Sequence, residues 1–169
     1  MEEAGDLPRV HPDSGIGHGY FQAQIRGADF FRCHSDGNLA EGRKKLVDNA
    51  ETCAAMTRAA ATALGLKLFA PKGYEAAAAT AILPPEGSDS GIIVKGLKSQ
   101  FAAIVTDGQG EMKGSLFRIA HIGFFDYMDT IAIIGALEQV VAKFLPQTGI
   151  AFGTGLIAAQ KVYAERVAK

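Results

Sequence analysis

One stretch, residues 108–126, constrains the fold more than any other, and it reads GQGEMKGSLFRIAHIGFFD. It opens with three glycines, a residue that permits positive φ angles and close backbone approach. The alternation that follows predicts a short strand over residues 115–119. In that strand Phe117 and Ile119 face one side, whereas Leu116, Arg118 and Ala120 face the other. The sequence therefore predicts a strand whose apolar face lies opposite a face that carries one guanidinium.

The glycine-rich segment is not a phosphate loop by its spacing. A Walker A loop needs G-x-x-x-x-G-K-[ST] between a strand and a helix. Here Lys113 precedes Gly114, and a strand follows. We therefore interpret the segment as a hairpin connection that needs glycine, and Lys113 as a lysine at the surface or at a domain contact.

The remaining elements follow from helical and strand patterns. Asn38 with Glu41 predicts the capping box of a helix that ends near Gly65, and Asp126 predicts the cap of a long helix with Asp129 in its first turn. Further helices are predicted over residues 91–102 and 154–168, and further strands over residues 67–70, 77–83 and 103–106. The order α-β-β-α-β-β-α-α indicates an α+β fold, with helices packed on one face of a small antiparallel sheet.

The first part of the chain, residues 1–37, lacks such periodicity and is predicted to be a poorly packed arm that docks at most through Phe30 and Phe31. It contains His11, His18, Cys33 and His34, but their spacing matches no metal-ligand pattern. We therefore divide the chain into this arm and a domain over residues 38–169.

Composition excludes several classes of protein. The 169 residues are 48% apolar, which is enough for a packed core, and the net charge of −1 gives no reason to expect nucleic acid or acidic membrane as a partner. The apolar runs are shorter than the ~18 residues that a membrane helix needs. Cys33 and Cys53 form no C-x-x-C pair, and the acidic start differs from a signal peptide. We expect a cytoplasmic protein in which Cys53 packs on an apolar helix stripe.

Two polar residues of the central strand are the functional candidates. Arg118 has no acidic neighbour in sequence, so it must find its anion either in an internal salt bridge or in a ligand. His121 has a side chain that titrates near neutrality and could act as an acid or base. No carboxylate lies at an informative spacing, so a histidine satisfied by backbone hydrogen bonds is the favoured interpretation.

The runs KGSLFRIAHIG and FDYMDTIAIIGALE resemble the C-terminal small domain of class V pyridoxal-phosphate aminotransferases, of the alanine/serine–glyoxylate type. The resemblance extends from Thr57 through TRAAATALGLKLFA to the closing FGTGLIAAQKV, with Ala120 where the family usually has glycine. It implies transfer of an amino group from alanine or serine to a 2-oxo acid such as glyoxylate. It also implies that Arg118 binds the substrate carboxylate, with Lys113, Gly114 and His121 in supporting positions.

The same resemblance implies that this chain lacks the residues that bind the cofactor. In the family, the lysine that forms a Schiff base with pyridoxal phosphate and the aspartate that supports the ring come from a large domain upstream. No lysine here has a similar setting, so the chain is interpreted as a separated small domain, inactive alone, whose partners are that large domain, a second copy of the chain and the small substrate. A stand-alone module that binds a small carboxylate or phosphate, or an inactive interaction domain or truncated product, remains the alternative.

Overall fold

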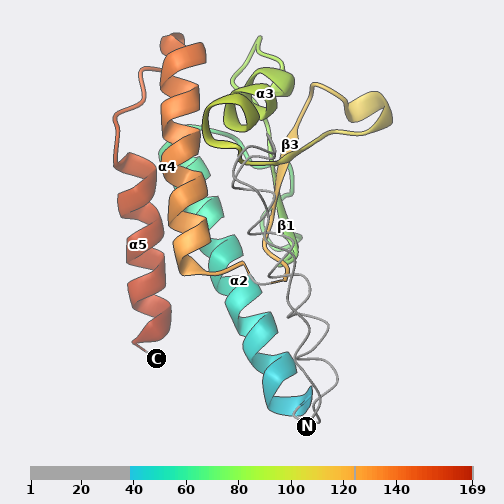
Figure 1. Cartoon of the computed structure of the whole chain (residues 1–169), viewed down its shortest axis with the longest axis vertical. Coiled ribbons are helices and arrows are strands. Elements are labelled where there is room, and N and C mark those ends of the chain that lie inside the picture. The colour runs from blue at the N-terminus through green and yellow to red at the C-terminus, as the bar shows by residue number, and fades with distance from the viewer. Residues whose placement is uncertain (1–38, 124, 169) are drawn as a thin grey trace, which may run out of the picture.

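A computed structural model of the chain describes residues 39–123 and 125–168 (Figure 1). Within this part the longer helices are α2 (Leu39–Ala63), α3 (Ser90–Phe101), α4 (Tyr127–Phe144) and α5 (Thr154–Val167), and the strands are β1 (Ala79–Ile82), β2 (Thr106–Asp107) and β3 (Phe117–Ala120). The predicted α+β class is confirmed. The predicted N-terminal arm, with Cys33, its histidines and the Asn38 cap, lies outside the described residues.

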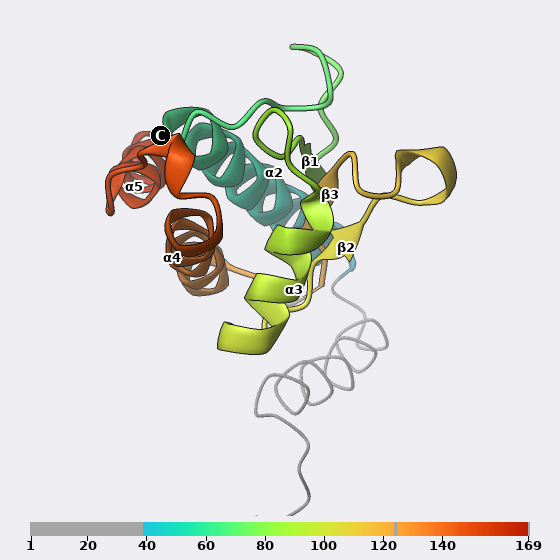
Figure 2. The same cartoon turned by 90° about the horizontal axis from the view of Figure 1, so that it is seen from above.

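The sheet has the strand order β1-β3-β2, and both pairings are antiparallel. β3 is therefore the central strand, with Ile119 opposite Thr80 of β1 and Arg118 opposite Thr106 of β2. Figures 1 and 2 show α2, α4 and α5 on one side of this sheet, while the loop between β2 and β3 extends away from the helices. The predicted alternation in β3 is confirmed, because Phe117 and Ile119 are buried and Arg118 is only half-buried.

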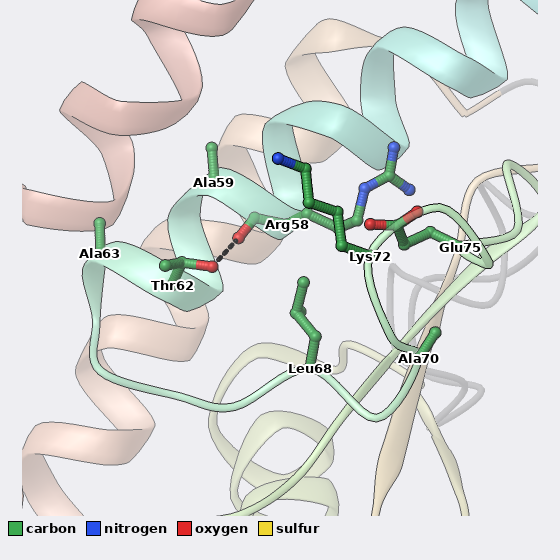
Figure 3. A pocket seen from close by; sticks show the side chains of 8 residues that line it. All are labelled: Arg58, Ala59, Thr62, Ala63, Leu68, Ala70, Lys72 and Glu75. Carbon is green, nitrogen blue, oxygen red and sulfur yellow. Dashed lines mark hydrogen bonds between the residues drawn. The ribbon is translucent and has the colours of Figure 1, made fainter.

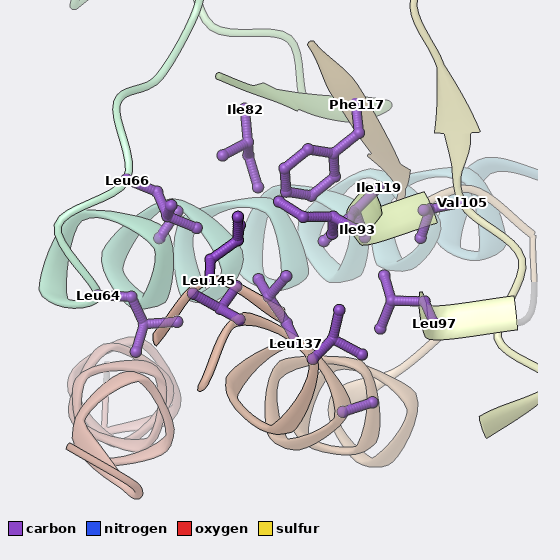
Figure 4. Packing of buried hydrophobic residues seen from close by; sticks show 14 residues of the cluster. Leu64, Leu66, Ile82, Ile93, Leu97, Val105, Phe117, Ile119, Leu137 and Leu145 are labelled. Carbon is purple, nitrogen blue, oxygen red and sulfur yellow. The ribbon is translucent and has the colours of Figure 1, made fainter. Parts of the chain in front are cut away.

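The main core forms where the apolar face of β3 meets the helices. Phe117 packs with Leu97 of α3 and Leu137 of α4 in one buried cluster, whose side chains converge between sheet and helices in Figure 4. The helix after Asp126 thus contributes Leu137 to the same core as Phe117 of the central strand. A second cluster, which includes Met56 and Ala159, joins α2, α4 and α5.

Several helix ends follow the predicted local chemistry. The carboxylate of Asp126 accepts hydrogen bonds from the backbone N–H groups of Met128 and Asp129, and the Asp129 side chain accepts one from the N–H of Asp126, which completes a capping box. Gly65 adopts φ +75° after α2, as a left-handed C-cap requires. At α3 the N-cap is Asp89, whose side chain accepts a hydrogen bond from the N–H of Gly91.

Three predictions about the positions of strands are wrong in detail. The strand predicted over residues 67–70 is reduced to one bridge, Leu68 to Ile82, because Pro71 and Gly73 turn the chain away. The strand predicted over residues 103–106 is β2 at Thr106–Asp107, and β3 begins at Phe117 rather than at residue 115. The described part thus has three strands, where the pattern predicted four.

Two phenylalanines at helix ends lie largely outside the core. Phe101 is 44% exposed and Phe144 is 41% exposed. Both occupy the final position of a helix. Among the described residues, no helix combines the length and the apolar character that crossing a bilayer requires.

Candidate functional site

Arg118 projects from the face of β3 that is opposite the core. Its Nη2 donates a hydrogen bond of 3.2 Å to the backbone carbonyl oxygen of Asp107 on the neighbouring strand. Its Nε is buried and has no hydrogen-bond partner among residues 39–123 and 125–168. Within the part of the chain that the structure describes, no carboxylate forms an ion pair with this guanidinium. The side chain is therefore tethered at one nitrogen and retains unused donors for an anion.

The side chain of Asp107 organises the loop beside Arg118. Its Oδ1 accepts hydrogen bonds from the hydroxyl of Ser90 at 2.6 Å and from the backbone N–H groups of Gly108 at 2.9 Å and Gly114 at 3.4 Å. The hydrogen bond from Ser90, together with those backbone donors and Lys113, holds the pKa of the Asp107 carboxyl below its usual value. The backbone N–H groups of Gly108 and Gly114 in this loop therefore bind the carboxylate of Asp107.

The glycines of this loop are required by close contacts. A Cβ at Gly108 would lie 1.9 Å from the carbonyl oxygen of Met112, so any side chain there would displace the backbone. Gly114 has φ +79°, and a Cβ there would lie 2.8 Å from the Asp89 carboxylate. The backbone donors of Gly108 and Gly114 serve Asp107, which supports the hairpin interpretation over a phosphate loop. Lys113 is exposed on this loop.

His121 lies on the other face of the sheet from Arg118. Its side chain is 1% exposed, and its Nε2 is 2.9 Å from the hydroxyl of Thr80, the residue opposite Ile119. Burial, with a smaller contribution from the Arg58 guanidinium, lowers the pKa of His121 to about 4. The structure therefore separates His121 from Arg118 and keeps the imidazole neutral. The ring therefore contacts a threonine hydroxyl rather than the backbone groups that were predicted, and its Nδ1 has no hydrogen-bond partner among the described residues. The backbone N–H of His121 donates to the carbonyl of Ala78 at 2.8 Å.

A shallow pocket lies elsewhere, between α2 and the segment that follows it (Figure 3). Its lining includes the cations Arg58 and Lys72 and the carboxylate of Glu75, and it does not include Arg118. Nη1 of Arg58 donates a 3.4 Å hydrogen bond to the carbonyl of Ala76, and Glu75 accepts one from the N–H of Gly73 at 2.7 Å. Its charges are thus mixed, and it is separate from the predicted site.

The described residues do not fit pyridoxal phosphate. A lysine that forms a Schiff base needs a desolvated, enclosed setting. Every described lysine is instead exposed: Lys44, Lys45, Lys67, Lys72, Lys95, Lys98, Lys113, Lys143 and Lys161. Cys53 is a buried free thiol whose pKa is raised, chiefly by burial. Across residues 39–123 and 125–168, no three side chains of the His, Cys, Asp and Glu types are grouped to hold a metal.

Comparison with known proteins identifies the class. No family model matches the sequence. The chain is 35% identical to L-aspartate–glyoxylate aminotransferase of Paracoccus denitrificans, over 77% of this chain and 33% of that protein. It is 36% identical to the soluble hydrogenase small subunit of a Synechococcus strain, over 73% of this chain and 32% of that protein. Its structure resembles pyridoxamine-pyruvate aminotransferase of Mesorhizobium loti with a TM-score of 0.67 and 27% identity, over 75% of this chain and 32% of that one.

The fold and the likenesses together define an aminotransferase-like α+β domain. Over about three quarters of its length the chain is similar to class V aminotransferases in sequence and in fold. It spans about one third of the length of the curated relatives that it matches.

Sequence reasoning missed two residues of this site. Asp107 and Ser90 were not selected, although their side chains meet at 2.6 Å beside the loop. The available signal was an aspartate directly before a glycine-rich turn, a position where a carboxylate can accept the turn's backbone N–H groups. Ser90 had no such signal, because its contact depends on how α3 packs against the sheet.

Proposed function

We propose that this chain is the substrate-carboxylate-binding domain of an aminotransferase that moves an amino group from a small amino acid to a 2-oxo acid such as glyoxylate. One observation carries the proposal: among the described residues Arg118 has a single hydrogen bond, to a neutral carbonyl, and a buried Nε without a partner. Relatives named L-aspartate–glyoxylate and serine–glyoxylate aminotransferase support small acids of this kind as substrates.

The proposed role of Arg118 is to bind and orient. Its planar guanidinium can offer two parallel N–H donors to a carboxylate, which sets both distance and angle. Orientation of this kind can contribute several kcal/mol to lowering a reaction barrier. We assign supporting roles to Gly114, which lets the start of α3 approach the loop, and to His121, which ties the end of β3 to β1. Lys113 is assigned to contact with a neighbouring domain.

Pyridoxal phosphate supplies the electron sink for amino-group transfer in enzymes that bind it. Since the described residues do not fit this cofactor, we place its binding groups in a large domain outside this chain. The chain alone is then inactive, and the working protein is an assembly with that domain and with a second copy. We place this assembly in the cytoplasm.

The proposal is tested in a chimera that joins this chain to the part of the Paracoccus relative that it does not match. The chimera should show pyridoxal absorbance and transfer amino groups to glyoxylate. In this background Arg118→Lys should weaken amino-acid binding and leave the absorbance unchanged, because lysine is a point charge without the fork. Unchanged substrate affinity in the lysine variant would remove Arg118 from the site.

A second candidate is a stand-alone binding or interaction module. The likeness to a protein named as a hydrogenase subunit favours it, since a subunit acts within a larger complex. Under this alternative the chain alone binds a small carboxylate at Arg118, and the chimera gains neither cofactor absorbance nor transferase activity.

A further inference from the structure

We propose that Asp107 and Ser90 are positioning residues for Arg118: the carboxylate of Asp107, held by the Ser90 hydroxyl, fixes the backbone carbonyl that orients the guanidinium toward a small 2-oxo-acid carboxylate. This inference rests on the proposed function for the identity of the ligand. The positioning itself follows from contacts within the chain.

The strand that carries this carbonyl is weakly supported by the sheet. β2 contains only Thr106 and Asp107 and pairs only with β3, so it is a short edge strand. Few ladder hydrogen bonds are available to an edge strand of this length. The orientation of the Asp107 backbone carbonyl therefore depends on other contacts. The Asp107 side chain supplies them through the hydrogen bonds that it accepts from Ser90, Gly108 and Gly114.

These contacts connect the carbonyl to the core. Ser90 is 0% exposed and is the first residue of α3, whose Ile93 and Leu97 are also 0% exposed. The Ser90 hydroxyl donates to Asp107 at 2.6 Å, and the Ser90 N–H donates to the Gly114 carbonyl at 2.9 Å. The start of a core helix thus holds the residue before the loop and the last glycine of the loop.

The chain of contacts ends at the guanidinium. From Asp107 the backbone carbonyl accepts the 3.2 Å hydrogen bond from Nη2 of Arg118, while Nε is enclosed. A long arginine side chain loses rotamer freedom when it binds a ligand, and a tether made beforehand reduces that loss. Positioning by Asp107 and Ser90 should therefore strengthen carboxylate binding even though neither side chain touches the ligand.

The test uses the full 169-residue chain labelled with 15N. The order and hydrogen exchange of the Arg118 Nε–H group are measured by NMR in the wild type, Ser90→Ala and Asp107→Ala. Loss of the tether at Nη2 exposes the buried Nε–H to water, so we expect its exchange to rise by up to about tenfold in either variant, the equivalent of one hydrogen bond. Asp107→Asn retains an oxygen acceptor and should give an intermediate change. If Asp107→Ala unfolds the chain, Ser90→Ala alone decides the outcome.

Ser99→Ala, on the same helix but exposed, and Asp48→Asn, on the exposed surface of α2, are the matched controls and should leave the Arg118 signal unchanged. Titration with sodium glyoxylate, against sodium chloride at equal ionic strength, then measures carboxylate binding. Ser90→Ala should weaken it several-fold. Arg118 order that survives both Ser90→Ala and Asp107→Ala overturns the positioning role. If the NMR signal of the Arg118 Nε–H group in the wild type does not change on addition of glyoxylate, the proposed function is overturned instead.

Discussion

The two faces of β3 use polar residues in opposite ways. On the core face His121 is 1% exposed, contacts Thr80 and is neutral because burial lowers its pKa to about 4. On the outer face Arg118 is half-buried, has no carboxylate partner in the described part of the chain, and is tethered by a neutral carbonyl. The difference shows that the degree of burial of a polar side chain determines whether it supports the fold or remains available to a ligand. A deeply buried neutral group supports the fold through a contact inside the protein, whereas a half-buried cation can keep its charge for a ligand.

The largest effect should come from the apolar side of the strand. Phe117→Ala removes a side chain that is 0% exposed at the centre of the main core. We expect the free energy of unfolding to fall by about 3–5 kcal/mol, because the change loses buried apolar surface and leaves a cavity. Urea denaturation measures this change. A loss no larger than that of an Arg118 variant would erase the contrast between the two faces.

A pH dependence should arise from the core face. His121 has a folded pKa of about 4 against an ordinary value of 6.5, so the folded state binds fewer protons in between. Stability is therefore fully present above pH 6.5 and declines as the pH falls toward 4, with a slope that approaches about 1.4 kcal/mol per unit. His121→Gln should flatten the slope in this window. Equal slopes in wild type and variant would assign the dependence to other groups.

The stability of the loop between β2 and β3 should depend on steric contacts at its glycines. Gly108→Ala places a Cβ where the carbonyl of Met112 lies, and we expect a loss of about 1–3 kcal/mol from the strain this creates. Gly110→Ala is the control, because its Cβ would meet nothing within 4 Å and only its φ of +57° is unfavourable. Thermal unfolding compares them. A control as damaging as Gly108→Ala would show that backbone angle, not contact, sets the requirement.

The smallest effect on stability should come from Arg118 itself. Arg118→Gln removes one hydrogen bond to a carbonyl, and we expect the unfolding free energy to change by about 1 kcal/mol or less. Glyoxylate binding by the same variant should be lost, because the cation that attracts the carboxylate is gone. A large loss of stability would instead place Arg118 among the structural residues, together with His121.

Much of the fold could be predicted from the sequence because interactions between residues close in the chain determine it. The alternation of β3, the capping box at Asp126 and the left-handed Gly65 depend on residues within a few positions of each other. The strand predicted over residues 67–70 is reduced to one bridge, because the turn at Pro71 and Gly73 takes the segment away from β1. Arg118 could be selected from the sequence as a cation without an acidic neighbour, but its tether to Asp107 could not be predicted.

The sequence by itself determined the class of fold, the two-sided character of β3 and most helix starts, since periodicity and caps act over short distances. Only the tertiary structure decided which polar groups meet. The first turn of α5 has no side-chain cap of its own and is capped by Glu138 of α4, which accepts from the N–H groups of Gly153 and Gly155 at 2.8 Å. Ser90 with Asp107 and Thr80 with His121 are likewise pairs of distant residues. Hydrogen bonds of this kind arise from how elements pack, and no local pattern encodes that packing.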